Sequence, residues 1–285
     1  MALTSVFRKS LRDQKWQIAG FGAALALVAA LDVLVWPAYR DTLQNLELPP
    51  AFQAFLGTDL SIATPAGFLS TEFFSWIPIL LIVYAVIQGT GAIGGEEGSG
   101  TMDMLLAQPV ARTTIVSAKA AATCLGIVLI IAIGFIGFAV TLPPVAIDVG
   151  ARDVAVAMAN MAPITLLFYA LALWLGSMAP SRAMAVAGTI AVATAGWLFN
   201  TLAQGIDALR GLRYASPFYY YGAGLPIVQG IDWAHAALLL GSAAALFALT
   251  LRAFARRDVS VGGGAEVDVA GAVMRAVRGG RRAQA

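Results

Sequence analysis

Residues 120–141 read AAATCLGIVLIIAIGFIGFAVT and contain no charged side chain. A helix needs about 20 predominantly apolar residues to cross the hydrocarbon core of a membrane, and this stretch is long enough. The run is too long for a membrane-spanning strand, and it lacks the alternation of apolar and polar residues that such strands show. Because lipid offers no hydrogen-bond partners to the backbone, the run is predicted to be a transmembrane helix.

Five further apolar runs of similar length predict that the chain crosses the membrane six times. Of the 285 residues, 59% are hydrophobic and only 12% are charged, whereas soluble domains carry about 25% charged residues. The fold class is therefore predicted to be all-α, with a six-span transmembrane domain over residues 17–257. The expected spans are about residues 17–37, 73–93, 120–141, 158–178, 183–203 and 233–253.

The distribution of Lys and Arg predicts the orientation of the chain. Of the 18 Lys and Arg residues, 14 fall in the segments that share a side with the N-terminus. Cytoplasmic loops carry such an excess, so both termini are expected in the cytoplasm, with the chain in the plasma membrane. The net charge of +2 is too small to indicate a nucleic-acid partner.

Both ends of the chain lie outside the predicted spans. In residues 1–16 the apolar side chains recur at helical spacing, and four Lys and Arg side chains lie largely on the other side. Such a helix lies in the membrane interface and contacts anionic lipid headgroups, although a basic leader that only sets the topology is the alternative. The Gly- and Arg-rich tail, residues 258–285, is expected to be either one amphipathic helix or disordered.

The loop after the second span has the features of a docking element. Residues 94–119 read GGEEGSGTMDMLLAQPVARTTIVSAK. Thr101 is a candidate N-cap for a short helix, and Pro109 would end that helix because proline lacks the backbone N–H. The helix would present an apolar face to the cytosol, although these side chains could instead pack on their own spans. That face consists of Met102, Leu105 and Leu106.

This loop resembles a pattern typical of type-2 ABC exporter permeases: an acid, then Gly-Thr, Leu-Leu and Pro-Val, followed by Arg and Lys. Three segments outside the loop agree with the resemblance. Residues 7–16 resemble the interfacial elbow helix of the family, residues 216–230 resemble the segment before its last span, and residues 254–258 resemble its exit into the cytoplasm. The matching loop residues are Glu97, Gly100, Thr101, Leu105, Leu106, Pro109, Val110, Arg112 and Lys119.

The resemblance implies a permease subunit of an ATP-driven exporter that is not itself an enzyme. Two permease subunits, as a homodimer or a heterodimer, would form the path, and a separate ABC ATPase subunit would dock on the coupling helix of each. No cofactor is expected on this chain, because ATP and Mg belong to the ATPase. The expected coupling residues are Gly100, Thr101, Met102, Leu105, Leu106, Pro109, Val110 and Arg112. Gating or loop anchoring is expected of Glu96, Glu97 and Lys119.

The turn between the fourth and fifth spans is very short. Only residues 179–182 connect the two apolar runs, so these spans are expected to be antiparallel neighbours. A second coupling contact through Ser181 and Arg182 would accordingly be small.

The sequence also bears on how transport is energised. A P-loop needs a Lys directly after a Gly, and none of the three lysines follows one, so the energy must come from a partner or from an ion gradient. An ion-coupled secondary transporter is therefore the alternative function. Asp32 is the only ionisable residue clearly inside a span. It could line a transport path, but a snorkelling or hydrogen-bonded side chain near the outer interface would explain its position as well. The candidate path residues are Asp32, Tyr84, Gln88 and Asn200. Interhelical hydrogen bonds would explain the last three equally well.

Catalytic functions receive little support from the sequence. The only His, His235, and Ser242 would lie on one face of the sixth span, which is thin support for a membrane serine hydrolase. One His and no H-E-x-x-H pattern exclude the zinc site of a metalloprotease. No catalytic and no metal-binding residue is therefore expected.

Overall fold

The computed structural model describes residues 2–44, 61–98, 112–145, 147–222 and 225–256, and these residues form helices and no strands. Six helical segments are long and apolar enough to cross a membrane, which confirms the predicted all-α fold with six transmembrane helices. The segments are Thr4–Leu43, Pro65–Ala92, Thr113–Val145, Ala151–Met178, Arg182–Ala203 and Trp233–Ala253.

The first span is one continuous helix, α1, which runs from Ala2 to Gln44. The N-terminal residues are helical as expected, but they are not a separate elbow, because no break falls between residues 16 and 17. At 1.5 Å per residue α1 is about 64 Å long, roughly twice the thickness of a hydrocarbon core. The structure thus differs from the expectation of an elbow helix set apart from the first span.

The second and fourth spans are each assembled from shorter helices. The second consists of α3 (Pro65–Leu69), the π-helix η1 (Ser70–Phe74) and α4 (Ile77–Gly98). The fourth consists of α7 (Ala151–Ala159) and α8 (Met161–Met178), separated by Asn160. Both spans begin earlier in the chain than the apolar runs suggest. The added residues include Ser70, Thr71 and Glu72 in the second span and Arg152 and Asp153 in the fourth, which interrupt the apolar pattern.

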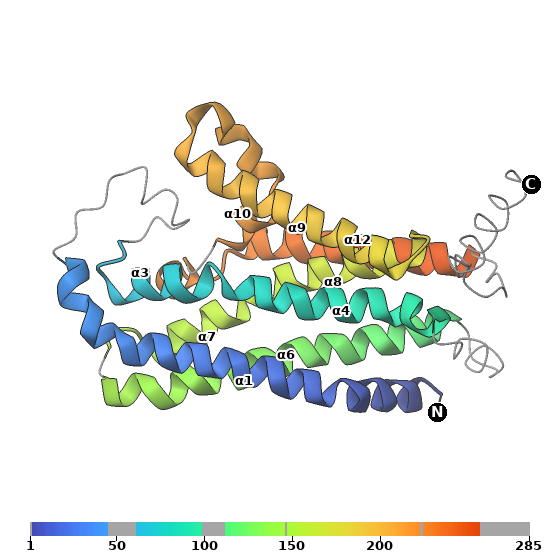
Figure 1. Cartoon of the computed structure of the whole chain (residues 1–285), viewed down its shortest axis with the longest axis horizontal. Helices are drawn as coiled ribbons and strands as arrows, with labels where there is room; N and C mark the ends of the chain where they lie inside the picture. The colour runs from blue at the N-terminus through green and yellow to red at the C-terminus, as the bar shows by residue number, and fades with distance from the viewer. Residues whose placement is uncertain (1, 45–60, 99–111, 146, 223–224, 257–285) are drawn as a thin grey trace, which may run out of the picture. The chain divides into compact units, whose positions relative to one another are not determined.

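The third, fifth and sixth spans are single helices, α6 (Arg112–Val145), α9 (Arg182–Gly205) and α12 (Trp233–Arg256). Successive spans run in opposite directions (Figure 1). The start of α1, the end of α4 and the starts of α6 and α9 therefore lie at one end of the bundle, which we call the N-terminal end.

The spans pack in pairs, with α1 against α6 and α4 against α8 (Figure 1). Glycines permit the close approach within each pair. A Cβ on Gly137 of α6 would lie 2.1 Å from the backbone oxygen of Ala26 in α1. A Cβ on Gly89 of α4 would lie 2.6 Å from the Cβ of Ala172 in α8. Small residues at such contacts let membrane helices gain van der Waals packing, which is a principal attraction between helices in lipid.

Aromatic side chains fill the core at the end of the bundle opposite the N-terminal end. The rings of Phe73 and Phe138 meet edge to face with centroids 4.8 Å apart, and Phe74 stacks on Phe138 at 6.3 Å. Trp36 of α1 contacts Phe68 of α3 at 5.2 Å. These contacts join the first three spans.

Short helices connect α9 to α12. They are the 3-10 helix η2 (Asp207–Ala215), α10 (Pro217–Tyr221) and α11 (Pro226–Gln229). Ser216 fixes their position, because its hydroxyl donates to the backbone oxygen of Gly196 at 2.6 Å and accepts from the N–H of Phe218 at 3.1 Å.

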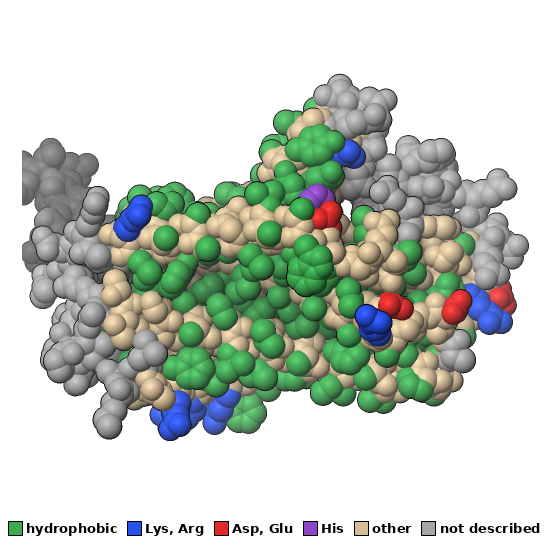
Figure 2. All heavy atoms as spheres, turned by 180° about the vertical axis from the view of Figure 1, so that it is seen from behind, with side chains coloured by type: hydrophobic (Ala, Val, Ile, Leu, Met, Phe, Trp, Pro, Cys, Tyr) green, Lys and Arg blue, Asp and Glu red, His purple; other side chains and the backbone are tan. Residues whose placement is uncertain are grey.

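The face drawn in Figure 2 carries apolar side chains over its middle and most of its charged side chains toward its two ends. Large side chains that a soluble protein would bury are exposed on several spans, including Leu27 of α1, Val128 of α6 and Ile190 of α9. An extended apolar surface of this kind suits contact with lipid.

Candidate functional site

A groove of about 780 Å³ lies between α4 and α9. This volume is in the range of small-molecule binding sites, and the walls are almost entirely apolar. Arg182 lines the groove at the first residue of α9, and Trp197 lines it about 22 Å further along that helix. Apolar walls come from Ile82 and Val86 of α4, Val186 and Ile190 of α9, and Phe218 of α10.

Arg182 joins α9 to α4 at the N-terminal end of the groove. Its Nη2 donates to the backbone oxygen of Ile87 at 3.3 Å, and its Nε lies 3.5 Å from Oγ1 of Thr90. A cation in the first turn of a helix is unfavourable with respect to the helix dipole. The contacts with α4 offset part of that cost and hold the guanidinium at the groove.

Buried polar side chains join α1, α4 and α6. The hydroxyl of Tyr84 donates to Oε1 of Gln14 at 2.8 Å, and Nε2 of Gln14 lies 3.3 Å from Oγ1 of Thr123. All three side chains are buried. Gly126 makes room for the tyrosine, since a Cβ there would lie 2.3 Å from the hydroxyl oxygen.

A second hollow of about 260 Å³ lies at the N-terminal end of the bundle, and we call it the basic pocket. Lys119 of α6 lines it and donates from Nζ to the backbone oxygen of Ala92 in α4 at 2.8 Å. This bond ties together the two helices that flank the loop after the second span. The charged and amide side chains of the pocket include Lys9, Asp13, Gln17, Gln88, Lys119 and Arg182.

Most of the expected coupling residues, from Gly100 to Val110, lie outside the described residues, and so does the expected tail helix. Arg112 is the first residue of α6, and Glu96 and Glu97 lie in the last turns of α4. The third span therefore begins earlier than the expected residue 120, since α6 is continuous from Arg112.

The four candidate path residues are dispersed, and none of them lines the groove. Tyr84 is fully buried and donates a hydrogen bond to Gln14. Gln88 lines the basic pocket and donates to Gln17 of α1. Asp32 is half-buried in α1, where one carboxylate oxygen is enclosed without a hydrogen-bond partner among the described atoms. Asn200 is half-buried on α9.

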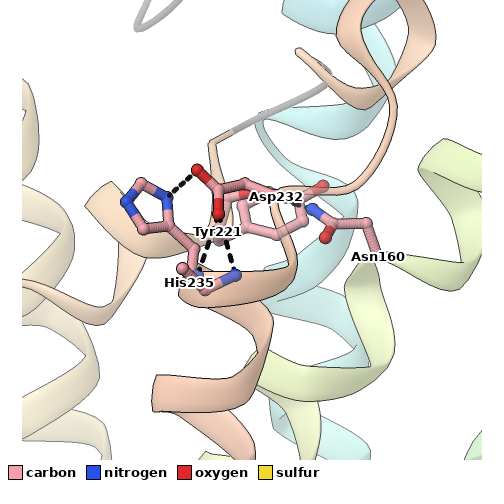
Figure 3. A network of polar contacts seen from close by, with 5 residues as sticks. Asn160, Tyr221, Asp232 and His235 are labelled. Carbon is pink, nitrogen blue, oxygen red and sulfur yellow. Dashed lines mark hydrogen bonds and ion pairs between the residues drawn. The ribbon is translucent and has the colours of Figure 1, made fainter.

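A second polar network holds the connection between α9 and α12 to the bundle (Figure 3). Nδ2 of Asn160 donates to the backbone oxygen of Tyr221 at 2.7 Å, and the Tyr221 hydroxyl donates to the backbone oxygen of Phe74 at 2.9 Å. Thus α10 is hydrogen-bonded both to η1 and to the break between α7 and α8.

Asp232 caps the start of α12 in the same region. Its Oδ1 accepts from the N–H groups of Ala234 at 2.9 Å and His235 at 3.1 Å, and its Oδ2 lies 3.6 Å from Nδ1 of His235. The N–H of His235 and the imidazole beside it favour the carboxylate and lower the pKa of Asp232. The His235 ring also contacts the rings of Tyr219 and Tyr220. These contacts give His235 a structural role at the start of α12.

Several of the residues that hold these networks were not identified from the sequence. Asn160 and Thr123 are single polar residues in apolar runs, where an unpaired polar group is costly, so each could have been predicted to form an interhelical hydrogen bond. Gln14 lies among charged residues, and nothing in the sequence separates it from a solvated side chain. The part of the chain that the structure describes holds no group of three or more His, Cys, Asp or Glu residues placed to bind a metal ion.

Comparison with known protein families identifies the family of the chain. A sequence model of the family described as ABC-2 family transporter protein matches residues 6–259. The match covers all six spans, both polar networks and the groove. No curated protein matches the chain.

Proposed function

Because the chain belongs to the ABC-2 transporter family and is a membrane subunit of an ABC transporter, we propose that it is the permease of an ATP-driven exporter. Two copies, or one copy and a related chain, form the translocation path in the plasma membrane with their termini in the cytoplasm. Each permease binds a separate ATPase subunit.

The groove between α4 and α9 is the observation that carries this proposal. Its apolar walls provide a surface for a cargo within the membrane, and its volume suits a small molecule. The helix α9 is the least buried of the six spans, so it has a large surface available to a second subunit. In the proposed dimer each permease contributes one such wall to the path.

Coupling to ATP hydrolysis uses residues 94–119. The bond between Lys119 and Ala92 holds the two flanks of this loop together, so a force on the loop reaches α4 and α6 jointly. Since α4 forms one wall of the groove, motion of the loop changes the shape of the path. Residues 101–110 insert into the ATPase, Arg112 contacts an acidic group on it, and Glu97 acts at the inner gate.

The test is the substrate-stimulated ATPase activity of the reconstituted complex carrying Leu105→Asp and Leu106→Asp. We expect stimulation to fall at least tenfold, because two carboxylates would have to enter an apolar contact. Leu105→Met and Leu106→Met conserve volume and apolarity and are the matched control, which should retain stimulation. Normal assembly with the ATPase and normal stimulation in the Asp variant would refute the coupling role.

Ion-coupled transport is the competing mechanism, and vesicles containing the permease distinguish the two. Export requires that inside-out vesicles accumulate cargo only when both the ATPase subunit and ATP are present. Accumulation by the permease alone, abolished by an ionophore, would instead support the ion-coupled mechanism.

A further inference from the structure

The groove and the basic pocket meet, because Ile87 and Arg182 line both of them. Side by side they present two parts of different chemistry. The part between α4 and α9 is apolar over about 22 Å of α9, from Arg182 to Trp197. The smaller part, at the N-terminal end, is polar and charged.

The charges of the basic pocket are predominantly positive. Three cationic side chains line it, and Asp13 is the one acidic side chain among its described lining residues. The pocket also exposes the amides of Gln17 and Gln88, which can donate or accept. A compact anionic group would therefore find both opposite charge and hydrogen-bond donors there. The cationic residues are Lys9, Lys119 and Arg182.

Arg182 is placed to act at the boundary between the two parts. Its contacts with Ile87 and Thr90 engage two of the five guanidinium N–H donors. Among the described residues it forms no ion pair, although its charge lies at the unfavourable end of α9. An anion at this position would receive charge-assisted hydrogen bonds and relieve the unfavourable interaction with the helix dipole.

We propose that the groove and the basic pocket together bind one amphiphile with a compact anionic headgroup, which lies in the basic pocket against Arg182 while the apolar body extends along the groove toward Trp197. The inference rests on the proposed function, since it assigns the cargo class of the same groove. Uncharged hydrophobic compounds would contact the groove without using the cationic side chains.

Binding is measured with the full-length permease in phosphatidylcholine nanodiscs, without the ATPase. The probe is a single-chain alkyl phosphate with bromine near the end of the tail, which quenches tryptophan only at short range. The chain has six Trp residues, so the Trp197→Phe variant supplies the signal to subtract. The brominated alcohol of the same chain length and inorganic phosphate are the comparison ligands.

We expect saturable quenching of Trp197 by the alkyl phosphate, with the alcohol binding at least tenfold more weakly. Arg182→Gln should weaken binding of the alkyl phosphate by about tenfold or more while leaving that of the alcohol unchanged, since it removes a charge-assisted contact. Arg252→Gln is the matched control, because this exposed arginine of α12 lines neither hollow and should bind as the wild type does.

Four results would overturn the assignment. Equal affinity for the two brominated probes would show that the headgroup is not recognised, and unchanged binding in Arg182→Gln would exclude its role. Displacement of the probe by inorganic phosphate at comparable concentration would identify a phosphate site that does not need the groove. The absence of Trp197 quenching would indicate that another occupant, such as the second subunit, covers the groove.

A final measurement tests whether the bound amphiphile is a cargo or a resident lipid. It also distinguishes failure of this inference from failure of the proposed function. In the complex with the ATPase, the alkyl phosphate should stimulate ATP hydrolysis, and Arg182→Gln should reduce that stimulation. Binding without stimulation, in a complex that other compounds do stimulate, would overturn the cargo class alone. A complex that no compound stimulates would instead contradict the proposed function.

Discussion

At the residue scale, the contact between Gly126 and Tyr84 gives the sharpest prediction of stability. We expect Gly126→Ala to lower the free energy of unfolding by about 1–3 kcal/mol, because its Cβ would lie 2.3 Å from the hydroxyl of a fully buried tyrosine. Denaturant titration of the purified permease in mixed micelles measures the change.

Two variants make this prediction specific. Gly20→Ala is the matched control, since a Cβ there meets no atom within 4 Å, and it should be neutral or slightly stabilising. In a Tyr84→Phe background, where the clashing oxygen is absent, Gly126→Ala should be clearly less destabilising. An equal penalty in both backgrounds would show that the contact does not limit stability.

Some contacts of single residues could not be predicted from the sequence. For Tyr84 two interpretations remained open, and its bond to Gln14 shows that an interhelical hydrogen bond is the one that the structure contains. Gln14 and Tyr84 are separated by 70 residues, and no rule on spacing within one helix pairs residues across such a distance. Arg182 was considered only as a minor coupling contact, because its position beside α4 depends on tertiary packing.

At the scale of elements, the cap of α12 predicts a pH dependence. The folded pKa of Asp232 is lowered, so the carboxylate stabilises the start of α12 above the unfolded pKa of about 3.9. This stabilisation is lost as the pH falls through the folded pKa. Hydrogen-exchange protection of the Ala234 and His235 amides should therefore decrease at low pH and be weak in Asp232→Ala at every pH.

Asp232→Asn is the matched control for the cap. Its amide oxygen can still accept both N–H groups but does not titrate in this range, so protection should persist with little dependence on pH. Full protection of these amides in Asp232→Ala would mean that the cap does not hold the start of α12.

Elements follow from the sequence to different degrees. Long apolar runs predicted six spans because lipid leaves the backbone no alternative to a helix, and all six are present. The continuity of α1 was not predicted, although residues 2–19 contain no Gly or Pro that would end a helix before the apolar run. The π-helix η1 depends on contacts with other spans and has no comparable pattern in the sequence.

At the scale of the whole molecule, the orientation of the bundle is testable by labelling. Cys124 is the only cysteine, so a Cys124→Ser variant is a background for single new cysteines at Thr4 and at Gly211. A membrane-impermeant maleimide should label Gly211→Cys on intact cells and Thr4→Cys only after permeabilisation, because the Lys and Arg distribution predicts that the N-terminus is inside.

Labelling of Thr4→Cys on intact cells would reverse the orientation and place the loop of residues 94–119 away from ATP. Thr4 and Gly211 are both exposed, so a difference in labelling reports their side of the membrane rather than burial. Cysteine at Gly20, within the first span, should resist the reagent on both sides and serves as the control.

The groove itself could not have been predicted from the sequence. Side chains that face lipid and side chains that face an apolar path have the same composition, as the neighbouring Ile190 and Val192 of α9 illustrate. Ile190 lines the groove and Val192 does not, and only the packing of α9 beside α4 distinguishes them. The family match and the position of the loop, in contrast, depend on residue order and were accessible at once.

The length of α1 has a mechanical consequence. From Ala2 to Trp36, before Pro37 interrupts the backbone bonding, the helix is a rod of about 52 Å. Tilting such a rod by about 10° about one end displaces the other end by roughly 9 Å. A small tilt at the basic first turns of α1 would thus become a large displacement at the far end of the helix.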